Sequence, residues 1–208
     1  PRPDEPLRVL MLASLFPKPG NERMGVWALA PARALRRRGV ELTVVSFTSW
    51  LPRAACVLGG TVRVWAGCPK EHRWPAVQGG DDVRTVYPRW LVYQKGALWR
   101  WCHRNPGPAG AIAWRSARRA LLRMGDELRP HVIYAHYTLP NGDLARRVKA
   151  LRGIPYVLVD HSRGEIDDCE HMPGRRAVFG AVLRESACWT GVSSVMLSSL
   201  ERLFPGTR

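Results

Sequence analysis

The sequence lacks three features that would each point to a definite class of protein. No stretch reaches the roughly 20 apolar residues of a membrane-spanning helix, and residues 1–6 lack a signal peptide's apolar region. The five cysteines form no CxxC pair and leave one over, which fits neither a disulfide framework nor a zinc site. We therefore expect a protein of a reducing cytosol that is soluble or lies on a membrane surface.

Several motifs of nucleotide-binding and hydrolytic enzymes are also absent. The sequence contains no GxxxxGK[ST] phosphate loop, no GxGxxG fingerprint and no GxSxG nucleophile elbow. No cysteine stands in a recognisable nucleophile setting, and no signature of an RNA-binding or helix-turn-helix module occurs. These absences argue against a P-loop NTPase, a serine or cysteine hydrolase and the common nucleic-acid-binding folds.

Acidic residues are few. There are 17 of them against 32 lysines and arginines, which gives a formal net charge of +15. Such a charge suits nucleic acid, an anionic membrane face or phosphorylated small molecules. Many arginines fall on expected helices that also carry an apolar face, so solvated helix faces are the plain alternative for any one cluster.

Two neighbouring strand-like runs each end in a histidine. Val132–His136 is followed by Tyr156–His161, and the chain between them has turn residues and then the helical spacing expected of a crossover. Parallel strands joined in this way deliver both histidines to one edge of the sheet, where ligands of open α/β sheets bind. A lone histidine is often only a core residue. Zinc would need a third ligand at short spacing.

A β-loop-α-β unit opens the chain. The buried-strand run Leu7–Ala13 leads into a loop rich in proline and glycine, Ser14–Gly25, then a helix that starts at Val26 and a strand Glu41–Ser46. Gly25 precedes the helix, where free backbone N–H groups and the helix dipole favour an anion. Turn geometry alone also explains a glycine at this point.

The remaining elements complete one α/β domain over residues 1–208, in which apolar strands without polar alternation predict a sheet covered on both faces. We expect strand-like pieces at Thr61–Trp65 and Val83–Tyr87, a basic amphipathic helix at Ile112–Leu128, a polar acidic loop at His161–Gly174, a helix at Arg175–Ser186, a strand at Cys188–Ser193 and a helix at Val195–Leu203.

Tryptophan is concentrated between Trp50 and Trp114, which hold seven of the nine. The segment Trp90–His103 mixes aromatic and basic residues, as an interfacial segment does. An aromatic satellite core and part of an acceptor pocket are the alternatives. The acids of the 165–170 loop are interpreted as solvated, because a glycosidase pair needs a fixed separation across a sugar.

Three stretches in this order resemble the amino-terminal half of glycosyltransferases of the group 1 (GT4) family, which have the GT-B fold. They are FPKPGNERMGVWALAPARALRRRGVELTVVS (16–46), RPHVIYAHYTLPNGDLARRVKALRGIPYVLVDHS (129–162) and AVLRESACWTGVSSVMLSSL (181–200). The resemblance covers about 85 of the 208 residues. It implies a Rossmann-like, doubly wound, mostly parallel sheet with helices on both faces.

The resemblance also implies roles for residues. His161 would contact the transferred sugar as the catalytic residue, and the loop with Gly20 and Gly25 would approach the donor diphosphate. No metal and no cofactor beyond the nucleotide-sugar co-substrate is expected. Here Ser162-Arg163-Gly164-Glu165 departs from the family's usual glycine after the second histidine. The cleft and acceptor side would comprise His136, Tyr137, Asn141, Ser162, Arg163 and Glu165.

The resemblance therefore implies an acceptor-binding domain of a retaining glycosyltransferase. Its partners would be a nucleotide sugar, a glycan, lipid-linked or small-molecule acceptor, an anionic membrane surface on the inner, cytoplasmic face, and a carboxy-terminal donor-binding domain that this sequence does not include. We expect the isolated domain to be inactive and no nucleic acid to bind. The alternative is a basic, non-enzymatic α/β module that binds nucleic acid or another phosphorylated partner.

Overall fold

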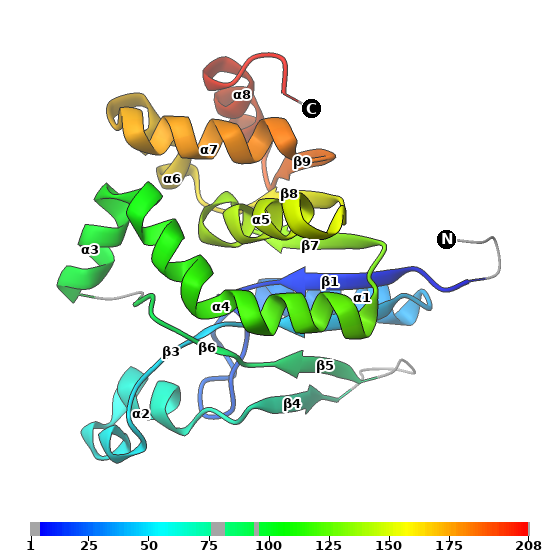
Figure 1. Cartoon of the computed structure of the whole chain (residues 1–208), viewed down its shortest axis with the longest axis vertical. Helices are drawn as coiled ribbons and strands as arrows, with labels where there is room; N and C mark the ends of the chain where they lie inside the picture. Colours follow the sequence, from blue (N-terminus) through cyan, green and yellow to red (C-terminus); the bar gives the residue numbers. More distant parts are fainter. Residues whose placement is uncertain (1–4, 76–81, 94–95, 208) are drawn as a thin grey trace. The chain divides into compact units, whose positions relative to one another are not determined.

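The computed structural model describes residues 5–75, 82–93 and 96–207. The chain divides into two compact units (Figure 1). Unit 1 comprises Pro1–Leu91 and Ser116–His131, and unit 2 comprises Val92–Arg115 and Val132–Arg208. The expectation of a single domain over 1–208 stays a prediction.

Unit 1 is built on parallel strands. β1 (Arg8–Leu12) pairs with β2 (Glu41–Val45), β2 pairs with β5 (Val83–Val86), and α1 (Val26–Arg37) connects β1 to β2. β4 (Glu71–Trp74) runs antiparallel to β5, as the opposed arrows in Figure 1 show. Four residues of β1 and four of β2 are buried, so the expected strands and the helix between them are confirmed.

Unit 1 also has smaller elements. The short strands β3 (Thr48–Ser49) and β6 (Arg89–Trp90) pair in parallel, and the 3₁₀ helix η1 (Arg53–Leu58) precedes α2 (Gly60–Gly67). The strand predicted at Thr61–Trp65 is wrong, because these residues lie in α2. Arg89 donates to the carbonyl groups of Trp65 and Ala66 in the last turn of α2, where a cation favours the helix. Tertiary contact thus overrides the strand preference of valine and tryptophan.

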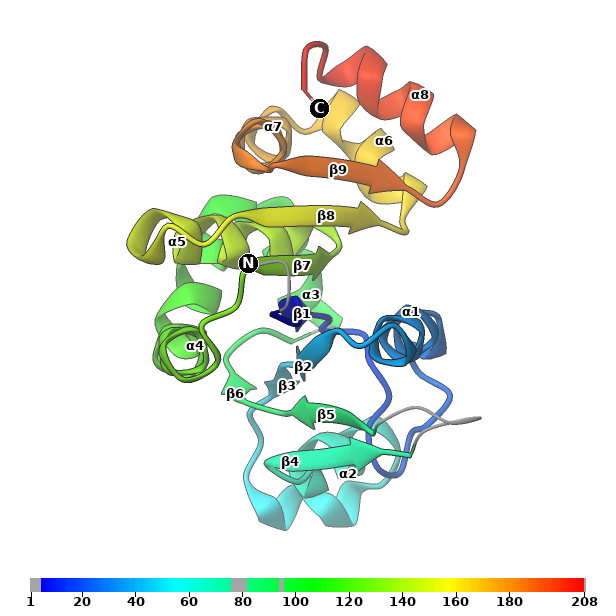
Figure 2. The ribbon, with the colours of Figure 1, turned by 90° about the vertical axis from the view of Figure 1, so that its right-hand side faces the viewer.

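In the described part of unit 2, parallel strands lie in the order β7 (Val132–His136), β8 (Tyr156–Asp160) and β9 (Cys188–Gly191). Their arrows run the same way in Figure 2. A π turn, η2 (Thr138–Gly142), and then α5 (Asp143–Arg152) form the expected crossover from β7 to β8. The mostly parallel α/β class predicted from the sequence is confirmed.

The helices of unit 2 include one that the sequence did not predict. The range His161–Gly174 is not a loop, because α6 (Arg163–His171) forms within it and buries Ile166 and Cys169 on one face. α7 (Pro173–Glu185) and α8 (Ser194–Leu203) match the predicted helices within two residues at each end.

Two helices come from the region between β6 and β7. α3 (Gly96–Arg104) belongs to unit 2, whereas α4 (Pro106–Leu128) has residues in both units and confirms the predicted basic helix with an earlier start. Of the predicted interfacial segment Trp90–His103, residues 94 and 95 lie outside the described residues. No helix within the described residues has the length and apolarity needed to cross a bilayer.

Candidate active site

His136 and His161 lie against each other in unit 2. Val159 of β8 pairs with His136 of β7, and His161 follows two residues later, so both side chains leave the same face of the sheet. Their rings are stacked with centroids 5.0 Å apart and planes at 14°, and His136 Nδ1 lies 2.9 Å from His161 Nε2. The structure therefore brings together the two strand-end histidines that the sequence singled out.

His136 is a buried, neutral imidazole. Only 1% of its surface is exposed, and burial, helped by nearby His161, lowers its pKa to about 3. Its Nε2 atom has no hydrogen-bond partner among the described residues. The Asn141 side-chain amide donates to the His136 carbonyl group over 2.7 Å. Asn141 is fully buried, and this bond ties it to the strand end that carries His136.

His161 is half-buried and more accessible than His136. Burial lowers its pKa, against the opposing effect of Asp160, and the Tyr137 ring lies 5.3 Å away. Two neutral imidazoles share one hydrogen bond only if one donates and the other accepts. Either arrangement leaves His161 Nδ1 for another partner.

Asp160 joins the ends of β7 and β8. Its carboxylate is 2% exposed and accepts hydrogen bonds from the backbone N–H groups of Thr138, over 3.1 Å, and of Ser162, over 3.2 Å. Tyr137, directly before Thr138, has a φ of 70°, a conformation that non-glycine residues rarely adopt and that is often found at functional sites. The loops that hold the histidine pair are therefore fixed by a buried carboxylate.

The other predicted cleft residues of unit 2 lie on α6. Arg163 is exposed and forms an ion pair with Asp167 over 3.3 Å, one helical turn along. Glu165 pairs with the buried Arg175 of α7 over 2.9 Å. Burial raises the pKa of Glu165 to about 7, against the pull of Arg175. In this structure both side chains are engaged within unit 2.

In unit 1 the predicted donor loop connects β1 to α1. Gly25 is the residue before α1, with φ 73°, and no side chain of the described residues caps this helix start. A Cβ atom on Gly25 would lie 2.2 Å from the Leu15 carbonyl oxygen, so only glycine fits. Gly20 has φ 83° but more space, because its nearest neighbour, Val64 Cγ2, would be 3.9 Å away. The two glycines are therefore required for different reasons.

A buried lysine that was not predicted from the sequence holds this loop. Lys18 is 1% exposed, and its Nζ donates to Ser46 Oγ over 2.9 Å and to the Ser14 carbonyl group over 3.3 Å. Burial lowers its pKa to about 8. The Tyr87 hydroxyl donates to the Pro17 carbonyl group over 2.8 Å. Lysine is usually exposed, so its burial could not be predicted from its position between two prolines.

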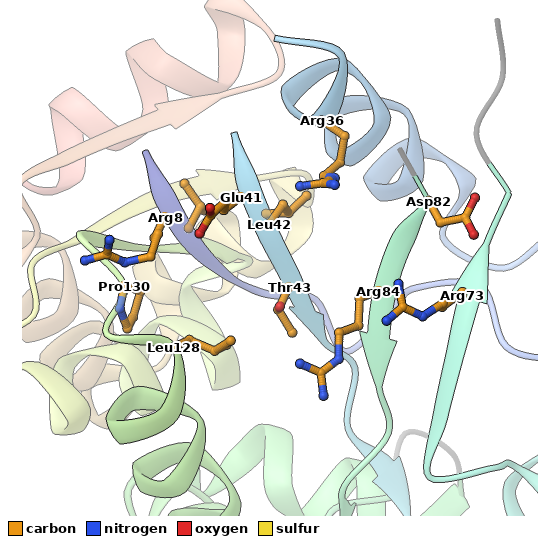
Figure 3. A pocket seen from close by; sticks show the side chains of 11 residues that line it. Arg8, Arg36, Glu41, Leu42, Thr43, Arg73, Asp82, Arg84, Leu128 and Pro130 are labelled. Carbon is orange, nitrogen blue, oxygen red and sulfur yellow. The ribbon is translucent and has the colours of Figure 1, made fainter. Parts of the chain in front are cut away.

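Described residues of unit 1 line a smaller and a larger cavity. The first, called the arginine cavity, has a volume of about 200 Å³ and lies by the first residues of β1 and β2 (Figure 3). Arg84 there donates to both carboxylate oxygens of Glu71 over 3.0 and 3.1 Å, and Arg8 pairs with Glu5. Arg84 and Arg8 thus have carboxylates close by. The lining residues that carry charge are Arg8, Arg36, Glu41, Arg73, Asp82 and Arg84.

The second cavity, called the Trp50 cavity, is larger, at about 920 Å³. It extends from η1 and the carboxyl end of β5 to α4. The sequence indicated only a tryptophan-rich region here. Its lining residues are Trp50, Leu51, Pro52, Arg53, Cys56, Ala66, Gly67, Cys68, Pro69, Lys70, Val86, Tyr87, Pro88, Arg89, Ala120, Arg123 and Met124.

The fold is similar to that of a known glycosyltransferase. No protein-family model and no curated protein matches this sequence. Among solved structures, the chain is similar to UGT73P12 of Glycyrrhiza uralensis, complexed with glycyrrhetinic acid 3-O-monoglucuronide, with a TM-score of 0.52 and 12% identity. The match covers 98% of this chain and 48% of that one, so this chain spans about half its length.

At this identity the likeness is one of fold. The chain has the mostly parallel, Rossmann-like fold of a GT-B glycosyltransferase domain, which confirms the predicted fold class. The similarity extends to the GT-B fold and does not single out the GT4 family.

Proposed function

We propose that this chain is the acceptor-binding domain of a retaining, GT4-type glycosyltransferase. The enzyme would move a sugar from a nucleotide donor to a glycan, lipid-linked or natural-product acceptor. The observation that carries this proposal is the stacked pair His136–His161 at the strand ends, joined over 2.9 Å. The GT-B fold and the three ordered sequence stretches support it.

In this proposal His161 is the catalytic residue and His136 positions it. His161 Nδ1 would form a hydrogen bond with a hydroxyl group of the transferred sugar. Positive charge develops at the anomeric carbon during glycosyl transfer. The lowered pKa of both histidines favours neutral rings, which avoid placing a cation beside that centre. Asp160 and Asn141 would keep the pair in place through their hydrogen bonds to the strand ends.

The loop of unit 1 is proposed to contact the donor diphosphate. Gly25 precedes α1 and no described side chain caps this helix start. The Ala28 N–H group donates to the Gly25 carbonyl group over 2.9 Å, so the N–H groups of Val26 and Trp27 are the ones proposed to meet an anion. The reaction breaks the bond between the anomeric carbon and the donor phosphate oxygen and forms one to the acceptor hydroxyl oxygen. The N–H groups would stabilise the leaving diphosphate, and the acceptor proton would pass to it.

We further propose that the acceptor is used at an anionic membrane surface on the cytoplasmic side. α3 has no buried residue, and it exposes Leu98, Trp99 and Trp101 beside Arg100 and Arg104. Indole rings favour the headgroup level, and arginines favour anionic lipid. Sedimentation with vesicles tests this, since Trp99→Ser with Trp101→Ser should reduce binding to anionic vesicles. Unchanged sedimentation would remove α3 from the proposal.

The catalytic role is tested in the natural gene product that contains this sequence. His161→Ala should lower kcat for sugar transfer about a hundredfold, as loss of one positioned transition-state hydrogen bond does in other enzymes. The control His171→Ala lies at the exposed end of α6 and should change kcat less than about twofold. An unchanged kcat in His161→Ala, or no nucleotide-sugar binding by calorimetry, would overturn the proposal.

A further inference from the structure

The Trp50 cavity has the size of a small-molecule site and a one-sided charge. Its volume of about 920 Å³ lies within the usual range for ligand pockets, roughly 300–1,000 Å³. Four of its lining residues are basic, and no aspartate or glutamate is among the described residues that line it. The four are Arg53, Lys70, Arg89 and Arg123.

The sequence explains why carboxylates are missing from this lining. There is no acidic residue between Glu41 and Glu71, and none between Asp82 and Asp126. All lining residues of the cavity come from these two acid-free stretches. The charge is therefore built into the segments that form the walls.

Within the described chain the basic groups have little compensation. Arg53 and Lys70 are exposed and form no ion pair with another described residue. Arg89 is held by the carbonyl groups of Ala66, over 3.3 Å, and Cys68, over 2.7 Å, and by that of Trp65. Arg123 lies 3.6 Å from Glu127, but both side chains are more than half exposed and solvent screens the pair.

The arginine cavity of the same unit gives the opposite picture. Its lining includes Glu41 and Asp82, and Arg84 and Arg8 are paired with Glu71 and Glu5. Basic residues alone therefore do not distinguish the two cavities. The absence of carboxylates from the described lining does, since it leaves a positive potential that a bound anion would neutralise.

The rest of the Trp50 cavity is apolar and aromatic. Trp50 is 52% exposed, which is unusual for so large an apolar side chain, while Tyr87 and Met124 are buried behind the cavity surface. Aromatic and aliphatic walls contribute to binding by removing apolar ligand surface from water. A ligand that uses the whole cavity therefore has an apolar part and an anionic part.

We infer that the Trp50 cavity binds an anionic amphiphile, in which a phosphate or carboxylate group is attached to an apolar body. Assigning this ligand as the acceptor rests on the proposed function. Arg53 and Lys70 would hold the anionic group, with Arg89 adding fixed positive charge. Trp50 would cover the apolar body. This excludes a neutral glycan as the group that fills the cavity.

Calorimetry with the 208-residue chain tests the ligand class directly. Decyl phosphate and decanoate, both below their micelle concentrations, should bind at least about tenfold more tightly than the neutral decyl maltoside, because only they neutralise the basic groups. Inorganic phosphate should bind at least about tenfold more weakly than decyl phosphate, since it leaves Trp50 uncovered. Equal affinity for decyl maltoside or for inorganic phosphate would overturn the inference.

Variants locate the site. Arg53→Ala with Lys70→Ala should weaken decyl phosphate binding about tenfold, and Trp50→Ala about fivefold. Arg73→Ala in the arginine cavity is the matched control and should change the affinity less than about twofold. All four residues are exposed, so the fold should persist. A loss in Arg73→Ala as large as in the double variant would overturn the location.

The two proposals can fail separately. Decyl phosphate binding at the Trp50 cavity, combined with no sugar transfer by the natural gene product, would overturn the glycosyltransferase function and keep the ligand class. Transfer to a neutral acceptor, combined with no decyl phosphate or decanoate binding, would overturn the ligand class and keep the glycosyltransferase function.

Discussion

The histidine site of unit 2 and the Trp50 cavity of unit 1 differ in how their polar groups are paired. In unit 2 the polar side chains bind one another, as His136 with His161 and Glu165 with Arg175 show. In unit 1 the start of α1 has no side-chain cap, and the basic residues of the Trp50 cavity include two with no ion pair among the described residues. Hydrogen bonds and ion pairs between side chains hold a site in place before a ligand binds. Charged groups without an ion pair favour the binding of a ligand of opposite charge.

The largest expected effect is at Gly25, where unit 1 depends on backbone alone. Gly25→Ala should lower the free energy of unfolding by about 3 kcal/mol, because a left-handed alanine costs about 1–2 kcal/mol and its Cβ overlaps the Leu15 carbonyl group. Gly20→Ala is the control and should cost only about 1 kcal/mol, since it has φ 83° without the overlap. Urea denaturation measures both. Equal losses would mean that close packing at Gly25 is unimportant.

The next largest effect is the pH dependence of stability caused by His136, the buried histidine of unit 2. The folded pKa of His136 is about 3, whereas an unfolded histidine titrates near 6.5. Above pH 6.5 the ring is neutral in both the folded and the unfolded chain, so it adds no pH dependence to the free energy of unfolding there. Between pH 6.5 and 3, the unfolded chain binds a proton that the folded chain does not. The free energy of unfolding therefore falls by about 1.4 kcal/mol for each unit by which the pH is lowered.

When the pH is lowered from 6.5 to 5, the loss in the free energy of unfolding caused by His136 amounts to about 2 kcal/mol. The wild-type chain should lose that much more than His136→Asn does, because the variant lacks the titrating ring and retains the other ionisable residues. Urea denaturation of both chains at pH 7 and at pH 5 gives the difference. The same pH dependence in both chains would show that His136 can be protonated in the folded protein.

The smallest effect concerns a capped helix of unit 2, in contrast to the uncapped α1. Ser193 Oγ accepts a hydrogen bond from the Met196 N–H at the start of α8. Ser193→Ala should cost about 1 kcal/mol, the usual value for a lost cap. Ser194→Ala is exposed one residue further on and should change stability by less than about 0.5 kcal/mol. Thermal unfolding would distinguish the two variants.

Regular elements were predictable where one local pattern dominated. The apolar runs of β1, β2, β7 and β8 are buried strands because their residues have no polar alternation. The Thr61–Trp65 prediction failed because Arg89, distant in sequence, binds the end of α2. The prediction of a loop at His161–Gly174 failed because only two residues of α6, Ile166 and Cys169, are buried. They stand among acidic residues, so the helical spacing was not evident from the sequence.

The candidate site divides in the same way. That His136 and His161 meet followed from two strand ends and a crossover of the right length. That Glu165 would pair with Arg175, and that Lys18 would be buried, had no local signal. Both depend on segments that pack from elsewhere in the chain.

The sequence by itself determined the parallel strands and the meeting of the two histidines. It also determined the acid-free stretches that make the Trp50 cavity positive. Only the tertiary structure decided that His136 is neutral, that Lys18 is buried and that these stretches surround one cavity. The local pattern of apolar residues predicts strands and helices. The burial and the pKa of a side chain depend instead on which atoms from distant parts of the chain replace water around it.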